Sequence, residues 1–152
     1  MIFNVMSLIA DFFACISVIV MILVYFNDKK RANKLATLDA YNRLQCDVFD
    51  VLNQWEPSVI RKAMNDHQSE EYVELSSLLA RIEHFCAGIN HNIYDYKIFR
   101  DVSKGYFGST RGKLYGRILP ILEEKTDGDN PKYYNNLISL WQRMSEEQDD
   151  SD

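Results

Sequence analysis

A run of fifteen uncharged residues, FFACISVIVMILVYF, occupies positions 12–26 and decides the architecture of this chain. Together with the apolar residues before it, the run gives about 25 residues, enough for one helical crossing of a bilayer at about 1.5 Å per residue. A secretory signal peptide has a basic start and a small-residue cleavage site, and neither is present here. We therefore expect residues 1–27 to form an uncleaved transmembrane anchor.

The distribution of positive charge predicts the orientation of this anchor. All 17 Lys and Arg residues lie from Lys29 onward, and four follow the apolar run at once: Lys29, Lys30, Arg31 and Lys34. The positive-inside rule places that side in the cytoplasm, which predicts a single-pass protein of the cell inner membrane with its N-terminus outside. The four cations either only set this topology or also contact the anionic headgroups of the lipid bilayer.

One charged residue, Asp11, falls inside the apolar layer. It lies fifteen residues from Phe26, roughly 22 Å along a helix, whereas the hydrocarbon core is about 30 Å thick. Either tilt, local water or protonation accommodates the carboxyl group, or it faces another helix. A stripe of small residues at spacings of 3, 4 and 3 borders it: Ser7, Ala10, Ala14 and Ser17. Such a stripe predicts a transmembrane packing surface and a homo-oligomer.

Beyond the anchor, the apolar pattern is helical throughout. Residues 28–56 combine the basic junction with an amphipathic helix whose stripe we expect to pack on the chain's own domain: Leu38, Tyr41, Leu44, Val48, Val51 and Trp55. Pro57 ends this helix. The strongest periodic signal follows, with Leu75, Leu78, Leu79, Ile82, Phe85, Cys86 and Ile89 on one face.

These signals predict a helical domain over residues 57–145. Helices are expected over 58–65, over 69–91 with Ser69 as the N-cap, over 94–103, over 110–124 and from Asn130 and Pro131 onward. Leu137, Leu140, Trp141 and Met144 would share a face of the last helix. The tail 146–152 is acidic and predicted to be disordered. The fold class is therefore all-α, with one N-terminal transmembrane helix continuing into a cytoplasmic bundle of five or six helices.

Several short patterns in this domain resemble a known family. They are Glu83 followed by Gly88-Ile89, then Tyr94-Asp95, then Tyr133-Tyr134, and a closing Leu140-Trp141 with Arg143. The chain thereby resembles an uncharacterised family of small bacterial single-pass membrane proteins with a helical cytoplasmic domain of unknown function. The resemblance implies structural roles: Glu83 pairing with a cation, Gly88 permitting close packing, and Asp95 capping the next helix.

The sequence offers no catalytic or cofactor motif. The loop Gly108-Ser-Thr-Arg-Gly112-Lys113-Leu114 has three residues between its glycines and no Ser or Thr after Lys113, so it is not a P-loop. His84 and His91 would lie about 10 Å apart along a helix, too far to share one metal ion. Glu70, Glu71 and Glu74 are interpreted as a solvated helix face. We therefore expect no enzyme, no cofactor and no metal site, and three reduced cysteines.

A local basic surface interrupts an otherwise acidic protein of 152 residues and net charge −5, a balance that argues against a general nucleic-acid partner. It consists of Lys97, Arg100, Lys104, Arg111, Lys113 and Arg117, with Asp101 as the opposing charge. These cations are either ordinary solvated side chains or a surface for an anionic partner. That partner would be a lipid face, a nucleotide, RNA or the acidic tail of the chain itself.

Two functional hypotheses follow, with a third behind them. The first is a membrane-anchored interaction or regulatory module that binds an unidentified protein partner. The second is a self-assembling effector that perturbs the membrane through its transmembrane helix. The third is a small enzyme or nucleotide binder that uses the basic surface of residues 97–117, and it has the least support because no catalytic constellation accompanies that surface.

Overall fold

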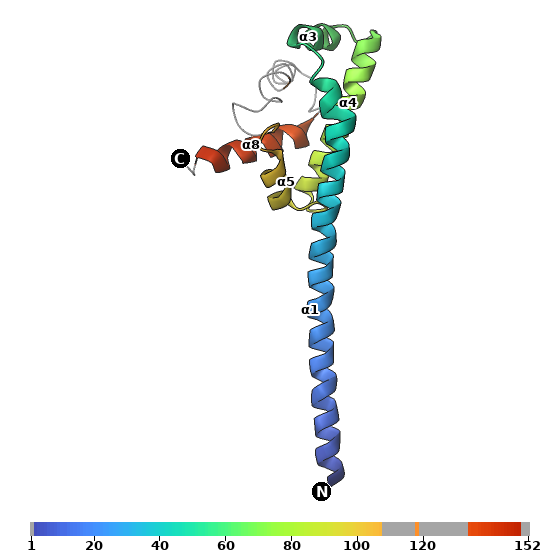
Figure 1. The fold of residues 1–152 in the computed structure, drawn as a ribbon, viewed down its shortest axis with the longest axis vertical. Coiled ribbons are helices and arrows are strands. Elements are labelled where there is room, and N and C mark those ends of the chain that lie inside the picture. Colours follow the sequence, from blue (N-terminus) through green and yellow to red (C-terminus); the bar gives the residue numbers. More distant parts are fainter. Residues whose placement is uncertain (1, 108–117, 119–133, 150–152) are drawn as a thin grey trace.

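A long N-terminal helix, α1 (Ile2–Leu44), extends well beyond a group of shorter helices gathered around its C-terminal part (Figure 1). The structure is a computed structural model and describes residues 2–107, 118 and 134–149. All elements in these ranges are helical and none is a strand. The predicted all-α fold is confirmed.

The N-terminal part of α1 is covered by no other part of the described chain. Its large apolar side chains stand exposed, including Phe12, Leu23 and Phe26. Within the described residues, one helical run is long and apolar enough to cross a membrane, with a mean hydropathy of 1.8 over its most apolar 18 residues. None of those residues is buried within the structure. By length and composition, this stretch is therefore a candidate membrane span.

The helical path continues from α1 through a π-helical turn, η1 (Gln45–Phe49), into the short α2 (Asp50–Leu52). The turn is defined by the Asp50 N–H, which donates to the Gln45 carbonyl five residues earlier. A π turn adds one residue to the α-helical repeat. Val48 and Phe49 are both buried in this turn, whereas the predicted stripe contained Val48 and not Phe49.

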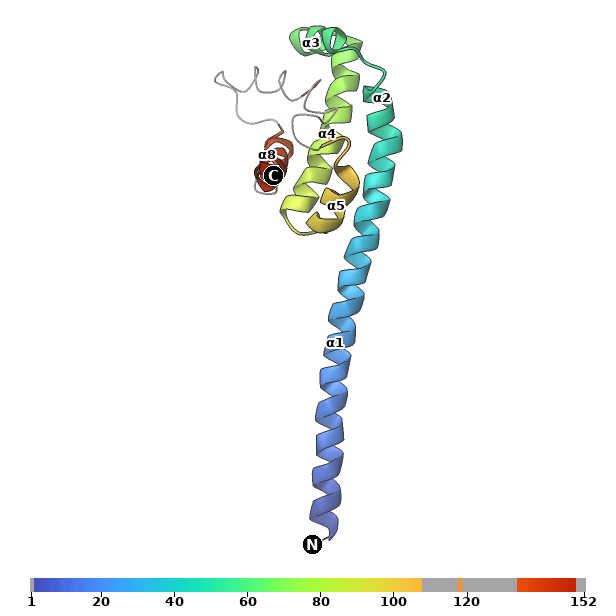
Figure 2. The ribbon, with the colours of Figure 1, turned by 60° about the vertical axis from the view of Figure 1, so that its left-hand side comes forward.

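Four further helices complete the described domain: α3 (Pro57–Asn65), α4 (Glu70–Asn90), α5 (Tyr96–Ser103) and α8 (Asn135–Asp149). Helix α4 lies between α8 on one side and the α1–η1–α2 path on the other (Figure 2). Its seven predicted core residues are all buried: Leu75, Leu78, Leu79, Ile82, Phe85, Cys86 and Ile89. The predicted stripe packs on this domain, since Tyr41 and Leu44 of α1 and Val48 of η1 are buried there.

The caps at both ends of α4 follow local chemistry. At its start, the Ser69 hydroxyl accepts a hydrogen bond from the Tyr72 N–H at 3.1 Å, as predicted. At its end, Asn92 adopts φ 57°, the Ile93 N–H donates to the Gly88 carbonyl and the Asn92 N–H to the Ile89 carbonyl. This pair of bonds is a Schellman motif, in which Asn takes the position that glycine usually occupies.

The connection after α4 is tied to α1 by a single buried side chain. The Thr37 hydroxyl accepts a hydrogen bond from the Asp95 N–H at 2.7 Å and donates to the Asn33 carbonyl, also at 2.7 Å. The Asp95 carboxylate caps α5 by accepting from the Ile98 N–H at 3.1 Å. The predicted cap is confirmed, and the bond to Thr37 fixes the start of α5 against α1.

The C-terminal segment differs from the prediction in one respect. Helix α8 continues to Asp149, whereas disorder was predicted from residue 146; the ion pair of Glu147 described below explains the added helical turn. The helix begins at Asn135, after Tyr134 with φ 72°. The predicted start at Asn130 and Pro131 and the helix over 110–124 lie outside the described residues, apart from Ile118, which is buried.

Candidate functional site

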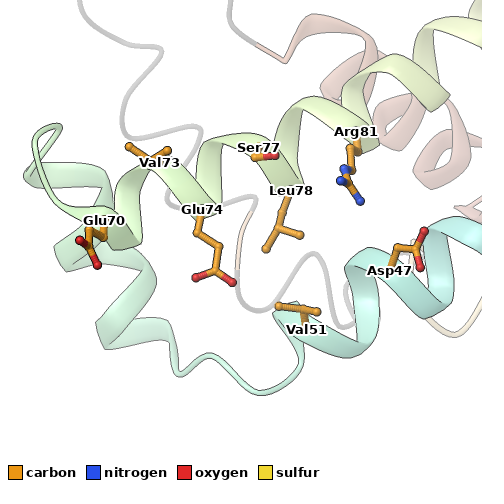
Figure 3. Close-up of a pocket in the computed structure, with 8 residues that line it drawn as sticks. All are labelled: Asp47, Val51, Glu70, Val73, Glu74, Ser77, Leu78 and Arg81. Atoms are coloured by element: carbon orange, nitrogen blue, oxygen red, sulfur yellow. The ribbon is translucent and has the colours of Figure 1, made fainter.

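A groove of about 520 Å³ lies between α4 and the η1–α2 path, at the end of the domain far from the N-terminus (Figures 1 and 3). We call it the distal groove. Its lining consists of Asp47, Val51, Glu70, Val73, Glu74, Ser77, Leu78 and Arg81. It is the candidate functional site because it combines an apolar floor with charged side chains at its edge.

The spacing of α4 residues produces the groove. Glu70, Glu74 and Leu78 form one row at intervals of four, and Val73, Ser77 and Arg81 form the neighbouring row. Rows of this kind are the ridges that helices present to their surroundings. Ser77 is the small residue at the centre of its row, so the surface is hollow between Val73 and Arg81.

Charge is distributed unevenly along the distal groove. Asp47 and Arg81 face each other at one end, whereas Glu70 and Glu74 lie toward the other end (Figure 3). The buried Leu78 and the half-buried Val51 form the floor between them. The groove therefore offers an apolar surface flanked by two carboxylates that no cation of the lining balances, which suits a ligand carrying both apolar and basic groups.

The π turn contributes one wall of this groove. Asp47 lies in the middle of η1, and Val51 follows one turn later in α2. The turn is anchored from beneath, because the Phe49 ring stacks on the Tyr106 ring at 3.7 Å and contacts the Phe107 ring edge-on at 5.6 Å. Single π turns within α-helices occur frequently at functional sites.

The sequence did not identify this site. Glu70, Glu71 and Glu74 were interpreted as a solvated face, and all three side chains are exposed. Glu70 and Glu74 nevertheless line the groove, whereas Glu71 does not. The spacing of four residues between Glu70 and Glu74, continued by Leu78, was the signal in the sequence for this wall of the groove. The opposite wall depends on the π turn, and no periodic pattern predicts a π turn.

A second polar cluster joins α5 to α8. The Arg100 Nη1 donates to the Glu147 Oε2 at 2.9 Å, and the Arg143 guanidinium stacks over the Tyr96 ring at 3.5 Å from its centroid. The hydrogen bond from Arg100 lowers the pKa of Glu147. Burial, followed by the adjacent Glu147, raises the pKa of Tyr96 to about 12. This cluster explains why α8 remains helical in a stretch rich in carboxylates.

This cluster also changes the interpretation of the predicted basic surface. Arg100 is engaged with Glu147 of the chain's own acidic segment and lies 3.9 Å from Asp101, so it is not an open anion site. Lys97 and Lys104 are exposed. The other three cations, Arg111, Lys113 and Arg117, lie outside the described residues.

The predicted membrane-contact and packing residues all fall on α1. Lys29, Lys30 and Arg31 are exposed, whereas Lys34 is half-buried. Ser7, Ala10, Asp11, Ala14 and Ser17 lie along the same helix. The Ser17 hydroxyl donates to the Phe13 carbonyl at 2.8 Å, so its hydroxyl proton is already used within its own helix.

Glu83 has a role that differs from the predicted pairing with a cation. Its carboxylate accepts from the Asn136 N–H at 2.9 Å, from the Asn136 side-chain amide at 2.8 Å and from the Leu137 N–H at 2.9 Å. The side chain of α4 thus caps the first turn of α8, where free N–H groups favour a carboxylate. Gly88 has the predicted packing role, because a Cβ there would lie 2.6 Å from the Tyr94 ring.

The histidines and cysteines named in the sequence do not converge. Among the residues that the structure describes, no three potential ligands cluster to hold a metal ion. His84 and His91 are exposed. Cys86 is buried, and burial together with the Glu83 charge raises the pKa of its thiol well above the usual value.

The class of protein defined by this fold is an all-α domain carried on an exposed apolar helix. The chain belongs to the family described as Domain of unknown function (DUF4760), whose family model matches residues 11–144. This match covers the whole apolar run of residues 12–26 together with most of the domain, and it confirms the resemblance to a family without an assigned function. Neither curated proteins nor solved structures give a significant match.

Proposed function

We propose that this protein is a single-pass membrane-anchored interaction module that presents its helical domain, with the distal groove, to a protein partner in the cytoplasm. The observation that carries the proposal is the unbroken helical path from the exposed apolar run to Leu52 in the domain core. The charge bias after the run supports an orientation with the N-terminus outside the inner membrane.

The chemistry of the distal groove supports a basic, amphipathic protein segment as the partner. Val51 and Leu78 would receive an apolar side chain, and Glu70 and Glu74 would receive lysine or arginine side chains. Among the lining residues, Ser77 is the only hydroxyl, and no histidine or cysteine accompanies it. This composition supports a binding role for the groove rather than catalysis.

A photo-crosslinking experiment on the full-length chain in its native membrane tests the proposal. A photoreactive amino acid at Ser77 lies inside the groove, and one at the exposed Ala80 on the same helix serves as the control. We expect a discrete crosslinked protein from position 77 and none from position 80.

Charge reversal then tests the electrostatic part. Glu74→Arg should abolish the crosslink from position 77, whereas Glu71→Arg should leave it intact, because both residues are exposed on α4 and only Glu74 lines the groove. Equal crosslinking from positions 77 and 80, or equal loss in both Arg variants, would contradict the proposed partner surface.

The alternative is an effector that assembles through its transmembrane helix and perturbs the membrane. It rests on the stripe from Ser7 to Ser17 with Asp11 beside it. The hydrogen bond of Ser17 within its own helix gives this alternative no added support, so we retain the interaction module as the leading proposal.

A further inference from the structure

We propose that the connection between α4 and α5, residues 91–95, is a second membrane contact that places Ile93 at the outer edge of the headgroup layer beside the anchor. The inference rests on the proposed anchoring of α1. It adds that the domain itself contacts the bilayer in which the anchor is embedded. The connection lies at the end of the domain that faces the N-terminal part of α1 (Figures 1 and 2).

The local motif leaves an apolar side chain exposed where it is usually covered. In a Schellman motif the residue after the left-handed position commonly packs on the last turn of the helix. That residue is Ile93, and its exposed fraction is 62%. The Gly88 position on this turn is occupied by the Tyr94 ring, within 2.6 Å of where a Cβ would stand, so Ile93 remains outside.

A hydrogen bond ties the connection to α1 near the predicted membrane surface. The Thr37 bond to the Asp95 N–H ties it to α1, and Asn33 and Lys34 on α1 are half-buried. Asn33 follows Phe26 by seven residues, about 10 Å along the helix. The headgroup layer covers about 5–7 Å of this distance.

Ordinary helix tilt closes most of the remaining gap of about 3–5 Å. Neighbouring helices pack about 8–10 Å apart, and a transmembrane helix is tilted by about 20° on average. A tilt toward the domain therefore lowers a point beside α1 by about 3 Å, which brings the connection to within about 2 Å of the outer edge of the headgroups, a distance that the Ile93 side chain can span.

The charges of the domain favour the same arrangement. At the anchor-side end, residues 28–34 and 91–97 contain five cations, Lys29, Lys30, Arg31, Lys34 and Lys97, against Asp28 and Asp95. At the far end, residues 45–81 carry seven exposed carboxylates against three exposed cations. An anionic bilayer attracts the first end and repels the second.

Lipid quenching of a fluorophore on the full-length chain tests this contact. With the exposed Cys15 and Cys46 replaced by Ala, and Cys86 left buried, an environment-sensitive fluorophore is attached to Ile93→Cys, Val73→Cys or Val20→Cys. Val73 is the matched control, since it is apolar, similarly exposed at 65% and located at the far end; Val20 reports the anchor. The proteins are reconstituted in phosphatidylcholine–phosphatidylserine nanodiscs containing nitroxide lipids.

We expect headgroup-labelled lipid to quench the fluorophore at position 93 and not at position 73, and acyl-chain-labelled lipid to quench it at position 20. Equal emission at positions 93 and 73, with position 20 quenched, would overturn the second contact while leaving the anchor in place. Loss of quenching at position 20 as well would overturn both the contact and the proposed function.

Discussion

Gly88 shows how one missing side chain shapes the turn after α4. Its position receives the Tyr94 ring, which also stacks on the Phe85 ring with centroids 5.3 Å apart. A Cβ at 2.6 Å from two ring atoms forces Tyr94 or the backbone to move. We expect Gly88→Ala to lower the free energy of unfolding by about 1–3 kcal/mol, the usual range for overpacking.

Gly105→Ala is the matched control for this substitution. No atom lies within 4 Å of a Cβ built there, and its φ is not positive. Alanine at such a site stabilises a protein by about 0.4–1 kcal/mol through the unfolded chain. Tryptophan-monitored urea unfolding of the full chain compares the two variants, and a similar shift in both would contradict the packing role of Gly88.

Cys86 is the other residue whose surroundings determine its chemistry. Its burial raises the pKa of the thiol, and the thiolate is the reactive form. We expect a polar maleimide to modify the exposed Cys46 in the native protein and to modify Cys86 only after denaturation, as read by peptide mass spectrometry. Modification of Cys86 at the rate of Cys46 would contradict the burial of α4.

At the level of elements, α8 depends on a carboxylate supplied by α4. Removing Glu83 leaves the N–H groups of Asn136 and Leu137 without their acceptor in a partly buried setting. We expect Glu83→Ala to cost about 1–3 kcal/mol of unfolding free energy. Glu83→Gln should cost less because it keeps one acceptor oxygen, and Glu74→Ala, at an exposed site on the same helix, should have little effect.

At the opposite end of α8, the ion pair of Glu147 predicts that the stability of the fold depends on pH. The pKa of Glu147 is lower in the folded protein than that of an ordinary Glu side chain, chiefly because Arg100 donates a hydrogen bond to its carboxylate. Its pair with Arg100 therefore stabilises the fold above about pH 4.5, and this contribution is lost as the pH falls through the lower folded-state pKa. Thermal unfolding across this range should show a small difference between the protein and Glu147→Gln at neutral pH, and none in acid. A difference that persists in acid would exclude this ion pair as its cause.

The elements also show what a sequence can predict. The face of α4 and the caps at Ser69 and Asp95 were predictable because each depends on residues within a few positions along the chain. The role of Glu83 was not, since its partners lie 53 and 54 residues away. The helical end of α8 was missed for the same reason, because the cation that holds Glu147 is 47 residues upstream.

At the scale of the whole molecule, the burial of the stripe along α1 and η1 predicts where self-association is possible. Tyr41, Leu44 and Val48 are already covered by the chain's own domain, so they are not available to a second copy. We expect a chain beginning at Asp28 to be monomeric in mild detergent. Any oligomer of the full-length protein should then depend on the anchor and weaken in Ala14→Leu.

Light scattering on the two detergent-solubilised chains measures this difference. Equal association of both chains would place the interface on the helical domain and contradict the prediction. An oligomer of the full-length chain alone would favour packing through the small-residue stripe.

Helix α1 runs without a break from the proposed anchor into the domain. The number of residues between them therefore sets both the rotation of the domain about the helix axis and its distance from the anchor. Each residue of an α-helix turns the chain by about 100° and advances it by about 1.5 Å. One alanine inserted between Phe26 and Asn33 would thus rotate the distal groove by about 100° around the anchor axis and move it only about 1.5 Å along that axis. The number of residues in that interval therefore sets the rotation of the domain about the helix axis. If two copies packed along their anchors, their grooves would be held at one fixed angle to each other about that axis.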